Sequence, residues 1–243
     1  MIVVVPVEPP RDGLVLSTLA ETTPLSTAEA TRLYEAATMD VLHAVDRSGG
    51  DLLVNYRDGE TLPERYDDGD PEAEIRALAA DVLEDTDEVR FERQVGSTRS
   101  ARIGNTVSHL LEREDAGGVG VVEPTAALLA RTDVDGAAMS LRRNDVVLGP
   151  STGGEPSLAC FAKPIDFEDA YAGPALGTFA RRSADAGHTV GFASRIPTLA
   201  TAAGLRATLA ELEARRVTDT SHPVATATAV DDLELALAED GTL

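Results

Sequence analysis

Short apolar runs alternate along the chain with longer stretches in which apolar positions recur at helical spacing. Brief runs bounded by turn residues are typical of buried strands, and the helical spacing is typical of helices with one buried face. The first run, Ile2 to Val7, is β-branched and leads into prolines, as a buried parallel strand can. The runs predict strands at residues 2–7, 51–56, 89–95, 118–122, 146–148, 158–161 and 188–193.

Helix signals fill most of the gaps between these runs. Ser26 and Glu29 have the spacing of a capping box, and Leu33, Ala37 and Val41 follow on one face of the helix that it opens. The helices predicted in this way cover residues 26–47, 71–84, 99–114 and 125–130, then about 132–143, 167–187 with a break at 173–174, 201–216 and 231–240.

This alternation of strands and helices predicts the fold class. We expect an α/β domain with a Rossmann-like, mainly parallel sheet flanked by helices. The domain spans residues 1–216. Residues 217–243, a Thr- and Val-rich segment followed by a short acidic helix, are predicted to form a C-terminal appendage rather than a second domain.

The formal charge of -21 bears on the environment of the protein. Acidic residues number 42 against 21 basic ones, and Lys163 is the only lysine. At about 1 M salt the Debye length falls to roughly 3 Å, so the self-repulsion of such a chain is screened. Because the carboxylates are spread along the chain, we favour an acidic halophilic protein over an acidic tail or a site for a basic partner. Nucleic acid and anionic membranes are not expected as partners.

Cys160 is the only cysteine, so no intrachain disulfide can form, which fits a reducing compartment. It lies in an apolar run, where we expect a buried and unreactive thiol. No stretch has the roughly 18 apolar residues that span a bilayer, and the N-terminal run lacks the basic residues of a signal peptide. We therefore expect a cytoplasmic protein, whose oligomeric state the sequence leaves open.

The stretch from Asn144 to Phe161 carries the strongest site signal. Two apolar runs flank a turn with Gly153 and Gly154, which lets the backbone approach a ligand closely. Ligands of open α/β sheets bind outside the carboxyl ends of the strands. Glu123 directly follows an apolar strand, where it could hold a divalent cation and its bound phosphates. A carboxylate that stabilises a helix N-terminus is an equally good interpretation of the same residue.

Arginines near the same strand ends are candidates for phosphate contacts. Arg11, Arg99 and Arg102 could each bind phosphate through two parallel hydrogen bonds, although Arg102 could instead pair with a surface acid such as Glu112. None of the four histidines shows metal-ligand spacing, and the chain has no P-loop, nucleophile-elbow or complete dinucleotide fingerprint.

Two segments carry a family resemblance: the run 145–150, which reads Asp-Val-Val-Leu-Gly-Pro and is followed by Gly153-Gly154, and the run from Gln94 through Gly96 to Arg102. On these residues the chain resembles the glycosyltransferase type-A superfamily, the nucleotide-diphospho-sugar transferases. The pattern is similar to a mostly uncharacterised glycosyltransferase-like branch near the 2-phospho-lactate guanylyltransferases of deazaflavin-coenzyme synthesis. The resemblance spans about residues 1–216 and implies a Rossmann-like fold that uses a nucleotide or nucleotide sugar, with Mg²⁺ or Mn²⁺ as the cation.

Several positions depart from the family pattern. The first loop, which is rich in Lys and Arg in the family, reads EPPRDGLVLS here. The family's metal-binding Ser-Asp is Val122-Glu123, its Asp-Gly-Gly begins with Thr152, and its late Asp-X-Asp is replaced by residues 195–198. Glu123 therefore remains as the candidate metal ligand. The resemblance assigns nucleotide binding to Arg11, Gly13, Gln94, Arg102, Gly153 and Gly154.

Two functions stay open at this point. The first is a glycosyltransferase- or nucleotidyltransferase-like protein with a degenerate metal and nucleotide site, in which Glu123 holds Mg²⁺ or Mn²⁺ and Arg11 holds phosphates. No catalytic residue is assigned. The second is a non-catalytic relative that binds a metabolite or a partner protein, which the missing basic loop and missing acids favour slightly.

The charge generates a prediction about salt. We expect folded structure to be lost on dialysis from molar salt to about 10 mM, where the Debye length is roughly 30 Å and the charge is barely screened. Circular dichroism measured across the dialysis series tests this, and an unchanged spectrum would show that the acidity serves another purpose.

Overall fold

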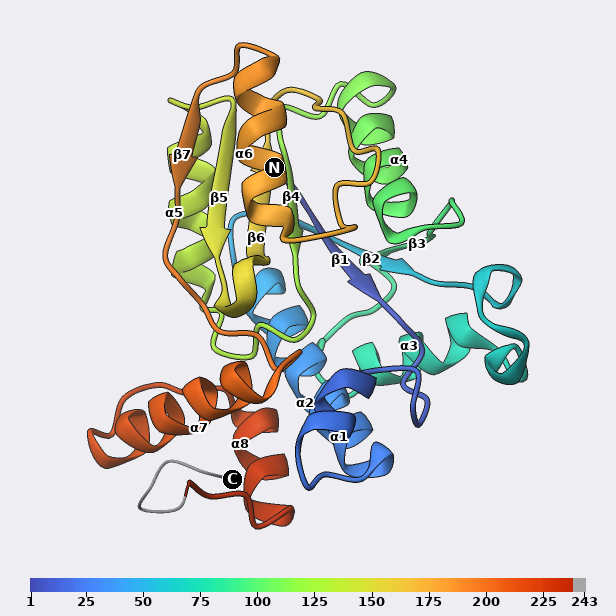
Figure 1. Ribbon diagram of the computed structural model, residues 1–243, viewed down its shortest axis with the longest axis vertical. Coiled ribbons are helices and arrows are strands. Elements are labelled where there is room, and N and C mark those ends of the chain that lie inside the picture. Colours follow the sequence, from blue (N-terminus) through green and yellow to red (C-terminus); the bar gives the residue numbers. More distant parts are fainter. Residues whose placement is uncertain (238–243) are drawn as a thin grey trace.

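The computed structural model, which describes residues 1–237, has three layers, with a central sheet covered by helices on both faces (Figure 1). Within these residues seven strands pair in the order β3-β2-β1-β4-β6-β5-β7. All pairs are parallel except the two that β6 forms with β4 and β5. The prediction of a mainly parallel α/β sheet is confirmed. The strands are β1 Ile2–Val7, β2 Asp51–Tyr56, β3 Arg90–Arg93, β4 Val119–Val122, β5 Val146–Pro150, β6 Pro156–Phe161 and β7 Val190–Phe192.

Six of the seven described strands run in the same direction, and only β6 is reversed. Because β6 runs against both β4 and β5, these two strands point the same way, and so do β1, β2, β3 and β7. The carboxyl ends of six strands therefore meet at one edge, which faces the lower half of Figure 1, where α1 and α7 lie.

Two cores form because successive strand residues point to opposite faces of the sheet. On β1, Val3 and Val5 belong to one core, and Val4 belongs to the other. Helices α2, α3 and α5 supply the first core, and α4 and α6 supply the second. The helices are α1 Ser17–Thr22, α2 Thr27–Asp46, α3 Pro71–Ala80, α4 Arg99–Glu112, α5 Arg131–Leu141, α6 Ala175–Asp185, α7 Ala202–Val217 and α8 Val224–Asp232.

An aromatic cluster anchors α6 to the sheet. Phe161 on β6, Phe179 on α6 and Phe167 in the segment before α6 meet edge to face, with ring centroids 5.3 to 5.7 Å apart. Tyr171 joins the cluster through Phe179 at 5.4 Å. Such pairs add to the free energy gained from burial alone. The cluster fixes the segment before α6 against the sheet.

The segment after α7 packs against the first helix layer. Asp40 on α2 accepts hydrogen bonds from the backbone N–H groups of Ala225 (3.1 Å) and Thr226 (2.7 Å) at the start of α8. Arg32 on α2 pairs with Asp232 at the end of α8 at 3.1 Å. Residues 224–232 are therefore held at both ends of their helix by α2.

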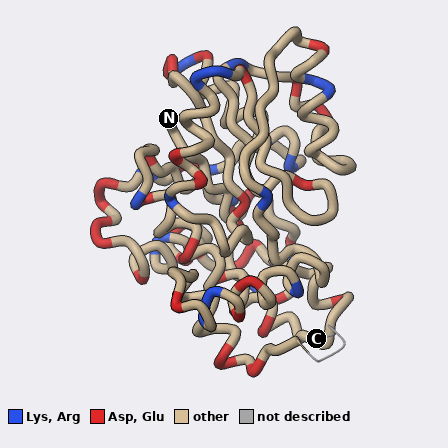
Figure 2. The backbone as a smooth tube through the Cα atoms, turned by 90° about the vertical axis from the view of Figure 1, so that its left-hand side faces the viewer, with Lys and Arg blue, Asp and Glu red and all other residues tan. Residues whose placement is uncertain are grey.

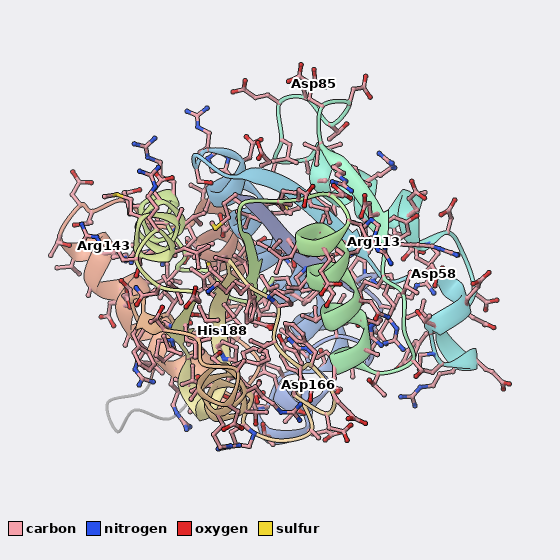
Figure 3. The ribbon with its side chains drawn as sticks, turned by 90° about the horizontal axis from the view of Figure 1, so that it is seen from above. Asp58, Asp85, Arg113, Arg143, Asp166 and His188 are labelled. Carbon is pink, nitrogen blue, oxygen red and sulfur yellow. The ribbon has the colours of Figure 1, made fainter. Side chains whose placement is uncertain are left out.

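Positions of charged residues are spread along the backbone rather than gathered in one part of it (Figure 2). Acidic residues follow the chain from end to end, and Asp85 projects outward from the β3 side of the molecule (Figure 3). Within residues 1–237 no helix has the length and apolar character needed to cross a bilayer.

Three predicted elements are wrong. Residues 125–130 form turns instead of a helix, because this apolar segment is buried on all sides and is held by Leu199, whose N–H donates to the Thr125 carbonyl at 3.0 Å. Residues 167–174 are also turns, so α6 begins only at Ala175. The last helix covers 224–232 rather than 231–240, and residues 238–240 lie outside the described part of the chain. In each case tertiary packing overrides helix propensity.

Two helical glycines give a matched stability prediction. A methyl group on Gly204 of α7 would overlap the carbonyl oxygen of Thr198, whereas a methyl group on the exposed Gly136 of α5 would meet no described atom within 4 Å. We expect Gly204→Ala to lower the free energy of unfolding by about 1–3 kcal/mol through overpacking. Gly136→Ala should raise it by about 0.5–1 kcal/mol, because alanine favours the helix.

Urea unfolding in molar KCl measures both values. Equal effects of the two substitutions would contradict the packing described for the start of α7.

Candidate functional site

A cavity of about 330 Å³ opens at the carboxyl edge of the sheet. It lies where the ends of β1, β2, β3 and β4 meet the start of α4, α1 and the middle of α2. This is the position at which open α/β sheets bind ligands. Three arginines and two glutamates line it: Arg57, Arg99, Arg102, Glu8 and Glu123.

Glu8, two positions after Pro6 near the end of β1, joins two of these arginines. Its carboxylate accepts from Arg57 Nη1 at 2.8 Å and from Arg102 Nη2 at 3.3 Å. Its backbone is held as well, because Glu8 N–H donates to the Tyr34 hydroxyl at 2.8 Å. Burial raises the pKa of the Tyr34 phenol, so this hydroxyl stays neutral. The carboxylate is therefore fixed between two guanidinium groups.

Gln94 orients Arg102 from the other side. Its side-chain oxygen accepts from Arg102 Nε at 2.7 Å, and its side-chain amide donates to the Asn55 carbonyl at 2.7 Å. The Arg102 side chain is only 8% exposed, and its Nη1 has no hydrogen-bond partner within residues 1–237. Burial lowers the pKa of this guanidinium, and the charge of Glu8 opposes that shift. A buried guanidinium with an unpaired donor that lines a cavity is suited to an anion.

Arg99 is the first residue of α4, and its guanidinium forms an ion pair with Glu123, which follows β4. The charge of Glu123 raises the pKa of the Arg99 guanidinium, so this side chain stays charged. The guanidinium also lies over the Tyr171 ring, 4.6 Å from the centroid. Nearly half of the Arg99 side chain is exposed, against 15% of Glu123. Arg99 is thus the accessible member of the ion pair.

The glycine turn after β5 lies at the same edge of the sheet as Glu123. Gly153 and Gly154 have φ of +80° and +88°, a conformation that favours glycine. Glu155 follows, and its side chain accepts from Ala175 N–H at the start of α6 at 3.4 Å. Burial raises the pKa of Glu155, and the nearby charge of Glu123 acts in the same direction. The turn lies beside the cavity and does not line it.

Arg11 and Gly13 lie on the other side of the first loop, away from the cavity lining. The Arg11 guanidinium pairs with Glu74 on α3 at 2.6 Å and donates to the Tyr66 carbonyl. Gly13 has φ of +77° and lies against the Tyr66 ring hydroxyl. In this conformation Arg11 ties two loops together. Of the residues that the resemblance assigned to the nucleotide, the cavity lining contains Gln94 and Arg102.

The side chains available as metal ligands determine whether the expected Mg²⁺ or Mn²⁺ could bind here. Within residues 1–237 no three His, Cys, Asp or Glu side chains gather in a way that could hold a metal ion. Glu123 is one of two carboxylates that line the cavity, and its carboxylate forms an ion pair with Arg99. Mg²⁺ is commonly held by one or two carboxylates together with substrate phosphates and water. The described residues therefore offer too few ligands for a cation held by protein alone, and would suit only a cation that a phosphate ligand also coordinates.

Sequence reasoning missed Glu8, Arg57 and Tyr34 as site residues. Glu8 pairs with an arginine 49 positions away, and Tyr34 lies 26 positions from the backbone that it holds. The one local signal was the position of Glu8 near the carboxyl end of β1, the same signal that identified Glu123 after β4.

No family model matches the sequence, and no curated protein matches it. Among solved structures, a proposed nucleotide-diphospho-sugar transferase from Desulfovibrio desulfuricans G20 superposes with a TM-score of 0.73, covering 96% of this chain and 95% of that one at 18% identity. A cytidylyltransferase from Leptospira borgpetersenii serovar Hardjo-bovis superposes with a TM-score of 0.52, covering 96% and 93% at 8% identity.

These structures match nearly the whole chain. Identities this low establish the fold and leave the chemistry to the site itself. The resemblance stated from the sequence is confirmed at the level of the fold: this chain shares the α/β fold of the structure described as a proposed nucleotide-diphospho-sugar transferase.

Proposed function

We propose that the protein is a nucleotide-dependent transferase of the glycosyl- or nucleotidyl-transfer type, with the phosphates of its donor bound in the carboxyl-edge cavity. The observation that carries this proposal is Arg102, a buried guanidinium with an unpaired Nη1 that lines a cavity at the ligand edge of the sheet. Structural neighbours described as nucleotide-diphospho-sugar transferase and cytidylyltransferase support the class.

The charge balance of the cavity supports an anionic ligand. Three guanidinium groups face two carboxylates there, in a chain whose acidic residues outnumber its basic ones two to one. A buried positive charge without a full complement of partners is costly, and a phosphate offers several strong acceptors. A volume of about 330 Å³ is at the lower end for ligand sites, enough for phosphate groups and part of the body that they carry.

Arg99 gives the site a second phosphate contact. It is half exposed and held by Glu123 and the Tyr171 ring. A phosphate that enters the cavity competes with the Glu123 carboxylate for this guanidinium. When the phosphate takes Arg99, Glu123 becomes free for a cation that the phosphate brings. The altered site would in this way retain a nucleotide function without the basic first loop of the family.

A second candidate function has its own support. The Arg99–Glu123 pair and the lack of a three-residue metal set within residues 1–237 favour a non-catalytic protein that binds a nucleotide or related metabolite. Two assays with Mg²⁺ or Mn²⁺ in molar salt separate the two functions: release of nucleoside phosphate from nucleotide sugars, and release of pyrophosphate from nucleoside triphosphates in the presence of a sugar phosphate. Catalytic turnover supports the transferase, and ligand binding without turnover supports the binding protein.

A matched pair of arginines tests where the phosphates bind. A nucleoside diphosphate at 100 times its dissociation constant should stabilise the fold by about 2.7 kcal/mol, or about 5–10 °C in melting temperature. Arg99→Gln removes a charged phosphate contact, which should weaken binding at least about tenfold. Arg11→Gln breaks an ion pair outside the cavity and should leave the dissociation constant unchanged.

Thermal shift and calorimetric titration in molar KCl give both constants. If Arg11→Gln weakens binding and Arg99→Gln does not, the phosphates bind at the first loop rather than in this cavity.

Glu123→Gln separates the two roles of the carboxylate. Removing its charge frees Arg99, so we expect nucleotide to bind more tightly than to the parent protein when no metal is present. The additional stabilisation by Mg²⁺ or Mn²⁺ should disappear, because the amide is a poor substitute for a charged ligand. A variant that keeps the full metal-dependent gain would rule out Glu123 as a cation ligand.

A further inference from the structure

A second and larger cavity of about 900 Å³ lies apart from the carboxyl-edge cavity. It is bounded by the outer face of α2, by the start of α8 and by residues 127–131, which lead into α5. In Figure 1 this region lies in the lower part of the molecule, where α2 and α8 pack side by side. None of its lining residues lines the carboxyl-edge cavity.

The interior of this α2–α8 cavity is apolar. Ala36 and Met39 of α2 line it, together with Leu128 and Leu129 of the turn that follows β4. Val224, which is 72% exposed, stands at the start of α8 and also lines the cavity. A volume near the upper end of ordinary ligand sites with an apolar lining suits the body of a small organic molecule.

The charged side chains of the cavity lining are balanced in number, unlike those of the whole chain. In the whole protein, 42 acidic residues exceed 21 basic residues and 4 histidines. In the cavity lining, four arginines match the four acidic side chains, and two histidines are neutral at pH 7. The arginines are Arg32, Arg47, Arg131 and Arg215, and the histidines are His43 and His222.

The acidic residues of the lining are partly neutralised by the protein itself. They are Glu35, Asp40, Asp81 and Asp232. Asp40 accepts from two N–H groups of α8, and Asp232 pairs with Arg32. Arg131, by contrast, is exposed and has no ion-pair partner within residues 1–237. An anion would find at this residue an unneutralised positive charge beside an apolar interior.

We propose that the α2–α8 cavity is a second ligand site, which binds a small organic anion with an apolar body. The apolar part lies against Met39 and Leu128, and the anionic group lies toward Arg131. The site goes beyond the proposed transferase function and does not depend on it, because no residue is shared with the phosphate contacts.

The test uses anilinonaphthalene sulfonate, a fluorescent aromatic anion, titrated against the folded protein in molar KCl. We expect saturable enhancement of fluorescence. Met39→Trp fills the apolar interior and should weaken binding about tenfold. Arg131→Gln removes the unpaired charge at the first residue of α5 and should weaken it about three- to fivefold.

Arg143→Gln is the matched control. It removes the same charge just beyond the other end of α5, at a residue that lies at the periphery in Figure 3 and outside the cavity lining. We expect this variant to bind the dye like the parent protein. Circular dichroism confirms that each variant is folded before titration.

Three results would overturn the proposal. The first is no saturable binding to the parent protein. The second is parent-like affinity in both Met39→Trp and Arg131→Gln. The third is displacement of the dye by a nucleoside diphosphate with no effect of Met39→Trp, which would assign the dye to the carboxyl-edge cavity.

Discussion

The arrangement of the site depends on the salt bridges that the Glu8 carboxylate forms with Arg57 and Arg102. Glu8 is the one acid that contacts both Arg57 and Arg102, and the Tyr34 hydroxyl holds its backbone in place. Two guanidinium groups with little exposure would otherwise be left beside each other without a counter-charge, which is strongly destabilising. Glu8 therefore allows arginines to gather at the edge of a sheet, and Gln94 then sets the direction in which Arg102 presents its free donor.

The other half of the site is supported by packing rather than by charge. Tyr171 is fixed by Phe179, which itself contacts Phe161 and Phe167. Its ring supports Arg99, which pairs with Glu123 and is nearly half exposed. The site thus combines a rigid, buried arginine with an accessible one. Such a pairing lets one contact be preformed and the other respond to a ligand.

Helices and strands are predicted well from the sequence where their signal lies in neighbouring residues. The capping box of Ser26 and Glu29 forms as the sequence indicates, and α2 follows it. The apolar run at 158–161 is a strand, but nothing in such a run encodes that β6 lies antiparallel between β4 and β5. Residues 125–130 have helical composition and form turns, because burial from every side outweighs propensity.

The site could be predicted only in part for the same reason. Strand ends are visible in the sequence, and two residues predicted from them, Gln94 and Glu123, line the carboxyl-edge cavity. The partners that give them their roles are distant along the chain: Glu8 lies 94 positions from Arg102, and Arg99 lies 24 positions from Glu123. The sequence predicts Arg11 as a phosphate contact because it is the basic residue of the first loop. Its pairing with Glu74, 63 positions away, left no mark in the local pattern.

The central claim is that phosphate binds at the carboxyl edge of the sheet between Arg99 and Arg102. The most direct measurement is a crystal structure of the protein grown from molar salt with a nucleoside diphosphate and Mg²⁺. The account predicts density for a phosphate group within about 3 Å of the Arg102 Nη1 and of the Arg99 guanidinium, with the Glu123 carboxylate turned away from Arg99. Density for the phosphates beside Arg11, or an unbroken Arg99–Glu123 pair with nucleotide bound elsewhere, would contradict it.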